Sequence, residues 1–185
     1  MTDHLPFYVD WADAPFAKIA ARASNNTKDF LGGTMNAIEL LKADHKVVDG
    51  LFQKVKAGEE EDQRALFEQI KAELDVHAHI EEAVFYPRLI AEGDTELADI
   101  VKEGIEEHHQ VKIFLREISA LAEESEKFEP KLMVLMENVE HHVMEEEGEM
   151  FQMVEEQFDP EVLEELGREM EEERQNFNKT QSARA

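Results

Sequence analysis

The chain lacks cysteine, and its 185 residues include only five prolines and eight glycines. The absence of thiols excludes disulfide bonds, thiol catalysis and thiolate metal sites, so a metal site here must use imidazole nitrogen and carboxylate oxygen. The scarcity of proline and glycine leaves long uninterrupted stretches, which is typical of long helices.

Positive charge is also scarce, because 19 basic residues face 44 acidic ones and the net charge is -25. Such a chain repels nucleic acid and anionic membranes and attracts cations, so we expect neither a nucleic-acid nor a membrane partner. No stretch approaches the roughly 20 apolar residues of a membrane span, and the first residues lack a basic segment followed by an apolar run. These features predict a cytoplasmic protein, and 42% apolar residues suffice for the core of one domain.

Apolar residues recur at helical spacing in four long segments with short connections between them, which predicts an all-α fold. Short connections favour an antiparallel four-helix bundle. Asp159 as N-cap and Pro160 as first helical residue predict a short fifth helix. The long segments are expected at residues 34–57, 62–91, 95–124 and 130–157. The predicted domains are an N-terminal arm (1–33), the bundle (34–157) and a C-terminal helix and tail (158–185).

The second half of the predicted bundle repeats polar features of the first half. His45 matches His108 at an offset of 63 residues. The pair His77 and Glu81 matches His142 and Glu146 at an offset of 65 residues. Two similar helical hairpins tend to pack with pseudo-symmetry, so both His-x-x-x-Glu pairs are expected to face one interior.

Helical register selects which histidines face that interior. Residues four apart lie within about 40° of each other and about 6 Å along the helix, so the two members of each pair point the same way. Both pairs continue the apolar rows of their segments. His142 lies in such a row whereas His141 does not, and the other histidines expected on the surface are His4, His79 and His109.

The six inward residues are interpreted as metal ligands. The alternative for a single histidine on an apolar face is a hydrogen-bonded core residue. Four imidazoles and two carboxylates buried without a cation would be strongly disfavoured by desolvation, and metal coordination satisfies all of them at once. Zinc and manganese suit these donors as well as iron does. The predicted ligands are His45, His77, Glu81, His108, His142 and Glu146.

Four motifs in this order resemble the hemerythrin-like HHE cation-binding family over about residues 34–157. They read LKADHKVV, VHAHIEEAVFYP, EHHQVK and HHVMEEEGEMF. The resemblance implies a four-helix bundle that holds two non-haem iron ions with carboxylate and oxo or hydroxo bridges. It also implies that His45 and His77 serve one iron, that His108 and His142 serve the other, and that Glu81 and Glu146 bridge them.

The chain departs from the similar oxygen-carrying hemerythrins at two places. Those carriers have a second histidine four residues from the first on the third helix, where this chain has Gly104 and Lys112. Their last helix has His-x-x-x-x-Asp, whereas here Glu146 follows His142 by four residues. Fewer nitrogen ligands leave more open positions on the metal, which favours reaction with dioxygen, peroxide or nitric oxide. Lys112, one turn from His108, is a candidate for the lining of the site. Asp49, four residues after His45, is a candidate either for an additional ligand or for an outer partner of a ligand.

Two functions therefore compete. The first is a di-iron protein that binds or reduces these small oxidants. The second is a non-enzymatic iron- or oxygen-responsive or metal-storage protein, whose bundle is stabilised by metal. A ferritin-like carboxylate oxidase is disfavoured, because that class uses Glu-x-x-His pairs and only Glu106 with His109 fits among the bundle histidines.

Overall fold

The computed structural model describes residues 35–58, 62–122 and 124–183, and these residues form helices and short connections with no strand among them. The described residues belong to one compact unit, Met35–Ala185. The predicted N-terminal arm lies outside the described residues. The helices are α2 (Ala37–Ala57), α3 (Gln63–Ile80), α4 (Tyr86–Glu92), α5 (Thr95–Ser119), α6 (Phe128–Glu145), α7 (Phe151–Gln157) and α8 (Pro160–Ser182).

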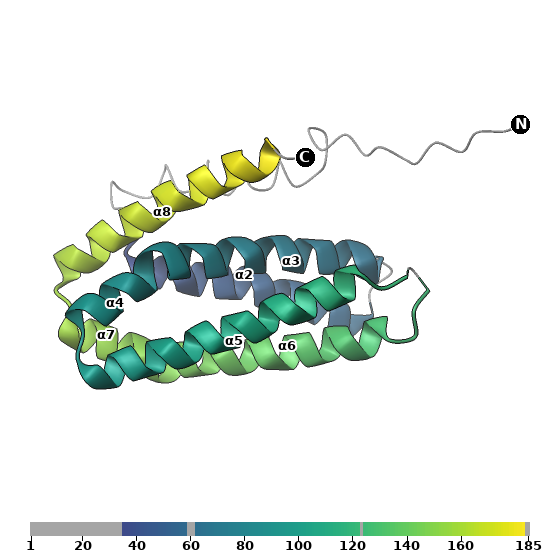
Figure 1. Cartoon of the computed structure of the whole chain (residues 1–185), viewed down its shortest axis with the longest axis horizontal. Helices are drawn as coiled ribbons and strands as arrows, with labels where there is room; N and C mark the ends of the chain where they lie inside the picture. Colours follow the sequence, from purple (N-terminus) through teal and green to yellow (C-terminus); the bar gives the residue numbers. More distant parts are fainter. Residues whose placement is uncertain (1–34, 59–61, 123, 184–185) are drawn as a thin grey trace, which may run out of the picture. The chain divides into compact units, whose positions relative to one another are not determined.

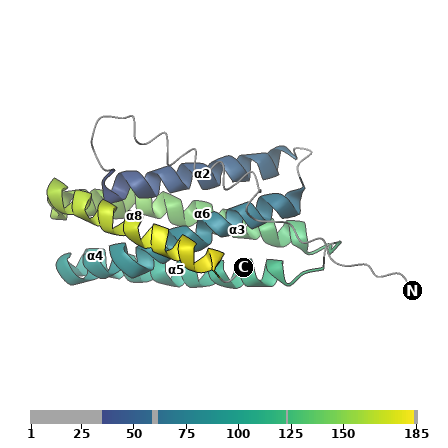
Figure 2. The ribbon, with the colours of Figure 1, turned by 90° about the horizontal axis from the view of Figure 1, so that it is seen from above.

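Two π-helical turns join shorter helices into long rods. The turn η2 (Glu81–Phe85) connects α3 to α4, and the turn η3 (Glu146–Met150) connects α6 to α7. These two rods pack with α2 and α5 into a four-helix bundle, and Figures 1 and 2 show the four rods running side by side. The all-α fold predicted from the sequence is confirmed. In the described residues no helix is both long and apolar enough to span a membrane.

Local sequence signals set the helix ends. Asn36 caps α2 with a capping box, in which its side chain accepts from the Glu39 amide and Glu39 accepts from the Asn36 amide. Gly58 ends α2 in the left-handed conformation at φ 62°, which glycine adopts without strain. The helix predicted to end near residue 124 ends at Ser119 instead. Just beyond this end, the Arg64 guanidinium donates to the carbonyls of Leu121 and Ala122. These hydrogen bonds satisfy two backbone acceptors that have left the helix.

The apolar core is divided into two clusters. One cluster contains Phe52, Phe67 and Leu135, and the other contains Phe85 and Phe151. The buried polar residues of the described chain are His45, His77, Glu81, His108, His142 and Glu146. These six side chains come from all four rods, and they are the residues predicted to face the interior.

The C-terminal helix α8 packs on the outside of the bundle, against α2, α3 and η2. It buries Leu163, Leu166 and Met170 in one of the core clusters. Gly167 permits the close approach, because a Cβ there would lie 2.3 Å from the Met35 carbonyl oxygen. The helix has 23 residues and is longer than the predicted short helix. The row of buried apolar residues in α8 ends at Met170. Beyond that point single polar and aromatic contacts hold the helix on the bundle, and the apolar pattern does not reveal them.

Candidate metal centre

Both π-helical turns begin at a predicted carboxylate ligand. In η2 the Tyr86 amide bonds to the Glu81 carbonyl five residues earlier, and in η3 the Phe151 amide bonds to the Glu146 carbonyl. The two turns are therefore equivalent under the 65-residue offset. Such turns are rare and frequently lie at functional sites, because they widen the helix locally and redirect the side chain.

Glu81 lies between two imidazoles from different helices. Its Oε2 is 3.1 Å from His77 Nε2 on its own rod and 3.2 Å from His108 Nε2 on α5. Glu81 itself is completely buried. The carboxylate thus contacts one histidine from each of the two predicted metal-binding pairs.

Glu146 occupies the equivalent place in the other half. Its Oε2 is 3.5 Å from His142 Nε2 on its own rod and 3.3 Å from His45 Nε2 on α2. The two imidazoles of the second half also meet directly, since the Nε2 atoms of His108 and His142 are 3.1 Å apart. The donor atoms of His77, Glu81, His142 and Glu146 lie within 4.8 Å of one another. The structure therefore brings the six predicted residues together in one buried layer.

An outer carboxylate faces the Nδ1 atom of each of the four imidazoles. Such a partner fixes the ring orientation and leaves Nε2 available toward the interior, as is usual for histidines that bind metals. The pairs are His45 with Glu147 (2.7 Å), His77 with Asp44 (3.4 Å), His108 with Glu82 (3.1 Å) and His142 with Glu107 (2.7 Å).

These outer carboxylates obey the same pseudo-symmetry. Asp44 reaches His77 within the first half, just as Glu107 reaches His142 within the second half. The other two pairs cross between the halves in a symmetrical way. Sequence reasoning missed all four outer carboxylates, although each lies next to a predicted ligand in the chain. This position next to a ligand was the signal that could have identified them from the sequence.

Tyr86 breaks the symmetry. Its hydroxyl donates to Glu146 Oε1 at 2.8 Å. The equivalent residue in the repeat is Phe151, which has no hydroxyl to donate. The rings themselves are placed alike, since Tyr86 stacks on His108 and Phe151 stacks on His45. Glu146 is therefore held by a hydrogen bond that has no counterpart at Glu81, because Phe151 cannot donate one.

Burial and neighbouring charge separate the pKa values of the two inner carboxyls. Burial raises the pKa of Glu81 well above its ordinary value, and the charge of Glu146 adds to this effect. Burial also opposes ionisation of Glu146, but His142, His45 and His77 together hold the pKa of Glu146 below its usual range. Burial lowers the pKa of His77 to about 4. In the metal-free cluster the two inner carboxyls therefore differ in acidity, and Glu146 is the stronger acid.

Several buried polar atoms of the cluster have no hydrogen-bond partner of acceptable geometry. They are both carboxylate oxygens of Glu81, Oε2 of Glu146 and Nε2 of His45. An unsatisfied buried polar atom costs about 1–3 kcal/mol, so native structures rarely leave several of them together. Cations within the layer would satisfy these atoms, and imidazole and carboxylate are suitable donors for iron, zinc or manganese. The donor set therefore fits bound metal.

The structure also places the residues that the sequence left aside. His141 is 56% exposed and His109 is exposed, as expected, and His4 lies outside the described residues. His79, predicted to be on the surface, is only partly exposed, because Glu173 and Phe177 of α8 cover it.

The two neighbours that the sequence left open lie outside the inner layer. Lys112 bonds both oxygens of Glu82 at 2.5 Å, so it supports the outer carboxylate of His108. Together with the hydrogen bond from His108, Lys112 helps to lower the pKa of Glu82 to about 2. Asp49 is exposed and accepts from Gln53.

A small apolar cavity touches all four imidazoles. Its volume is about 20 Å³. The remaining lining comes from the aliphatic residues Val48, Leu74, Ala78, Val111, Val139 and Val143. A cavity of this size exceeds the minimum of about 10–15 Å³ that holds one water molecule. It therefore has room for about one molecule of the size of water.

Four rods that contribute four histidines and two glutamates to one buried layer define a cation-binding helical bundle. Residues 36–154 match the hemerythrin HHE cation binding domain, and the chain belongs to that family. The chain is similar to the uncharacterized protein Rv2633c of Mycobacterium tuberculosis, at 31% identity over 118 residues, which are 63% of this chain and 70% of that protein. It is also similar to a DNA nickase of Nostoc sp., at 31% identity over 121 residues. The matched part is 63% of this chain but only 33% of the nickase.

A crystal structure gives the same fold. It is that of a hemerythrin HHE cation binding domain-containing protein from Mycobacterium kansasii, described as an Rv2633c homolog. The TM-score is 0.66 at 29% sequence identity, and the match covers 79% of this chain and 89% of the other.

Proposed function

We propose that this chain is a non-haem di-iron protein that binds or reduces dioxygen, hydrogen peroxide or nitric oxide. The observation that carries the proposal is the buried layer of four imidazoles and two carboxylates, in which every Nδ1 is held by an outer carboxylate and several inner acceptor atoms lack partners. Bound iron would supply electrons and open coordination positions to the oxidant.

The contacts of the two glutamates support two ions rather than one. Glu81 contacts one histidine from each predicted pair, and so does Glu146. This placement is what bridging carboxylates require. Each ion would then have two imidazoles and a share of both carboxylates, which leaves open positions, as in other non-haem iron sites with few protein ligands.

The chain's own residues favour a small neutral oxidant. The apolar cavity beside the imidazoles is small, and its aliphatic lining does not suit a charged substrate. Tyr86 holds its proton at Glu146 Oε1 and orients that carboxylate. The two apolar core clusters on either side of the layer keep bulk water from it on those sides.

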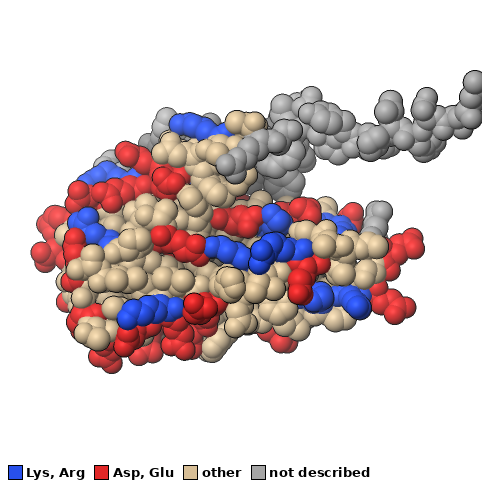
Figure 3. Space-filling view, in the orientation of Figure 1, with Lys and Arg blue, Asp and Glu red and all other residues tan. Residues whose placement is uncertain are grey.

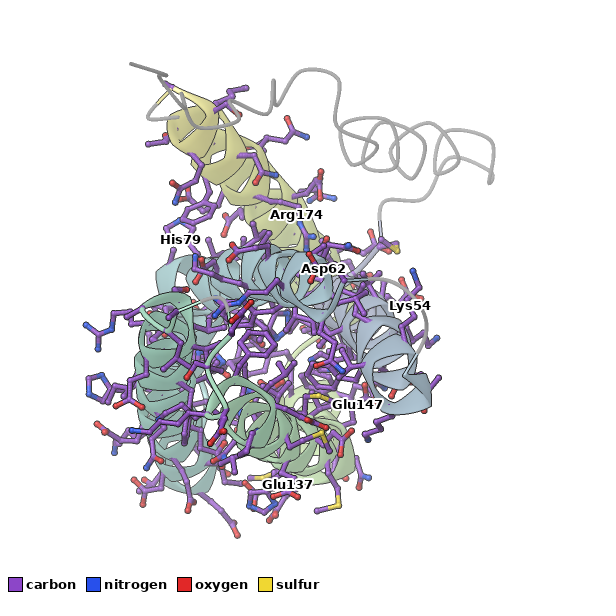
Figure 4. All side chains as sticks on the ribbon, turned by 90° about the vertical axis from the view of Figure 1, so that its right-hand side faces the viewer. Lys54, Asp62, His79, Glu137, Glu147 and Arg174 are labelled. Carbon is purple, nitrogen blue, oxygen red and sulfur yellow. The ribbon has the colours of Figure 1, made fainter. Side chains whose placement is uncertain are left out.

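An iron- or oxygen-responsive protein is the second candidate. Arg174 of α8 donates to both oxygens of Asp44, at 3.0 and 2.6 Å, and Asp44 faces His77 Nδ1. Figure 4 shows Arg174 on the side of α8 that faces the bundle. This chain of contacts links α8 to the cluster, so binding of metal can alter the docking of α8.

The activity named for the Nostoc relative is not proposed here. The net charge of -25 opposes binding to phosphate backbones. Figure 3 shows acidic side chains at the left and right ends of the face that it displays, with Lys and Arg side chains between them. We propose no nucleic-acid partner for this chain.

Stopped-flow absorbance of the anaerobically iron-loaded protein, mixed separately with dioxygen, peroxide and nitric oxide, tests the proposal. Oxidant-dependent changes that disappear in Glu81→Ala, whose metal content is measured in parallel, are expected. A loaded protein that reacts with none of the three but whose α8 loosens on chelation would favour the responsive protein.

A further inference from the structure

A second cavity leads from the surface to the buried cluster on the side of α5 and η3. Its volume is about 60 Å³, three times that of the apolar cavity. Four of its lining residues are glutamates that reach the surface, and they surround Gly104. The complete lining is Ile100, Glu103, Gly104, Glu107, His142, Glu145, Glu146, Glu149 and Met150.

The inner end of this cavity is formed by predicted ligands. Glu146 is 1% exposed, and its Oε2 has no hydrogen-bond partner of acceptable geometry. His142, which also lines the cavity, is buried as well. An unsatisfied carboxylate oxygen at the end of an acidic cavity is suited to receive a cation.

The outer end of the cavity also offers metal donors. The donor atoms of Glu107, His141 and Glu145 lie within 4.8 Å of one another. Glu103 and Glu149 are exposed beside them. Closely spaced carboxylates concentrate cations from solution and raise their rate of association. Glu107 also contacts His142 Nδ1, so it belongs both to this opening and to the cluster.

The internal repeat provides a comparison for this opening. At the offsets of 63 and 65 residues, four of the six residues equivalent to its five glutamates and its glycine are apolar, and the other two are Asp44 and Glu81. Leu40 and Leu41 stand for Glu103 and Gly104, and Ile80 and Val84 stand for Glu145 and Glu149. These residues pack in the core cluster that α8 covers with Leu163, Leu166 and Met170. Of the two places that the repeat relates, the one beneath α8 is therefore closed by apolar side chains, and the one beside α5 and η3 is lined by acidic side chains.

We propose that hydrated divalent cations reach the buried cluster through this acidic cavity. The inference rests on the proposed metal-binding function and adds the direction from which the cluster is filled. The apolar cavity is unsuitable for this purpose, because a cation that enters an aliphatic passage loses its water without compensation. Gly104 keeps the acidic cavity open, since a side chain at this position would extend toward Tyr86 and His142.

The charge of the opening is tested by Glu103→Gln with Glu149→Gln in the full chain. Neither residue contacts an imidazole nitrogen in the structure. The probe is Co²⁺ added to chelator-treated protein, followed by its absorbance in a stopped-flow instrument. We expect the initial uptake rate at low salt to fall at least about threefold and to depend less on ionic strength, because local attraction is lost. Glu68→Gln with Glu129→Gln, which removes the same charge from exposed positions outside the cavity, is the matched control.

The width of the cavity is tested by Gly104→Ala. The added Cβ lies 3.2 Å from the Tyr86 hydroxyl and 3.6 Å from His142 Cε1. We expect slower uptake of Co²⁺ and also slower removal of bound Co²⁺ by a chelator, because both directions use the same passage. Circular dichroism establishes that the variant is folded, and the surface charge variants keep the proposal testable if it is not.

Final Co²⁺ stoichiometry separates this inference from the proposed function. If wild-type protein binds two ions but the opening pair and the control pair slow uptake equally, or neither slows it, the acidic cavity is not the route. If wild-type protein binds no Co²⁺ at equilibrium, the metal-binding function itself fails, and the route with it.

Discussion

The hydroxyl of Tyr86 donates to Oε1 of Glu146 at 2.8 Å. Since Phe151 takes the equivalent position in the repeat, this hydrogen bond makes two otherwise matched halves unequal. The hydrogen bond holds Glu146, whose pKa the nearby imidazoles keep low against the effect of burial. Burial raises the pKa of Glu81, and neither Glu81 oxygen has a hydrogen-bond partner of acceptable geometry. Glu81 is thus the carboxylate that is freer to move when metal or oxidant binds.

Tyr86→Phe should reduce the stability of the metal-free protein. The change leaves Glu146 Oε1 buried without its donor, and we expect a loss of about 1–3 kcal/mol in the free energy of unfolding. Urea denaturation followed by circular dichroism measures it. Thr180→Ala removes a surface hydroxyl that bonds only to the Asn176 carbonyl, and it should change stability by less than about 0.5 kcal/mol. Equal losses in the free energy of unfolding of both variants would show that the hydrogen bond to Glu146 stabilises the fold no more than an ordinary surface hydrogen bond.

Glu146→Ala should abolish retention of at least one metal ion, whereas Glu145→Ala should retain both. The two residues are neighbours in the chain, but Glu146 contacts His45 and His142 inside the cluster while the Glu145 side chain is 43% exposed. Elemental analysis after gel filtration distinguishes the variants. Loss of metal from Glu145→Ala with retention by Glu146→Ala would mean that the wrong face of this helix was assigned to the cluster.

Arg174→Gln should weaken the attachment of α8 and the support of His77. Arg174 bonds both oxygens of Asp44, and the side chains are only 19% and 13% exposed. Hydrogen bonds to charged groups contribute roughly 1.5–3 kcal/mol, so a loss of about that size is expected in urea denaturation. Arg168→Gln, on an exposed position of the same helix, is the control. The metal affinity of Arg174→Gln should also fall, by up to about tenfold, because Asp44 orients a ligand.

The imidazoles of His45, His77 and His142 should titrate differently in the metal-free protein. Burial lowers the pKa of His77 to about 4. For His45 and His142 burial has the same tendency, but nearby carboxylates, Glu146 among them, overcome it and raise the pKa. Nuclear magnetic resonance of imidazole-labelled protein at pH 6 should therefore find His77 neutral and the other two charged. A charged His77 at this pH would contradict the assignment.

The direction of the stability change follows from these shifts. Between about pH 6.5 and pH 4 the unfolded chain binds a proton at position 77 that the folded chain does not, so the contribution of His77 to stability falls as the pH falls. His45 and His142 act in the opposite sense. Their contribution is fully present below about pH 6.5 and is lost as the pH rises through their raised pKa values.

The sequence predicted the bundle and the interior position of six polar residues, because both depend on helical periodicity. The choice of His142 over His141 rested on the same periodicity, and the burial of His142 agrees with it. The π-helical turns were not predicted, since the residues of η2 and η3 have no composition that separates them from an ordinary helix. The outer carboxylates were not predicted, because the chain has 44 acidic residues and the sequence alone does not show which of them face a histidine.

The sequence predicted that the fifth helix packs outside the bundle, but the length of α8 was beyond the sequence pattern. Its last three turns are held by Glu173, Arg174 and Phe177, which contact His79 and Asp44 on other helices. Contacts between residues about 100 positions apart leave no periodic signal in either segment. For the same reason, the difference between Tyr86 and Phe151 becomes informative only when the structure shows that Tyr86 contacts Glu146 of the other half.

The central claim is that the buried layer holds two iron ions. Elemental analysis of protein purified aerobically, without chelator and without a metal-binding affinity tag, tests it most directly. The account predicts about two iron atoms per chain, the number for which two bridging carboxylates are arranged. A single ion, zinc alone or no metal in folded protein would contradict it.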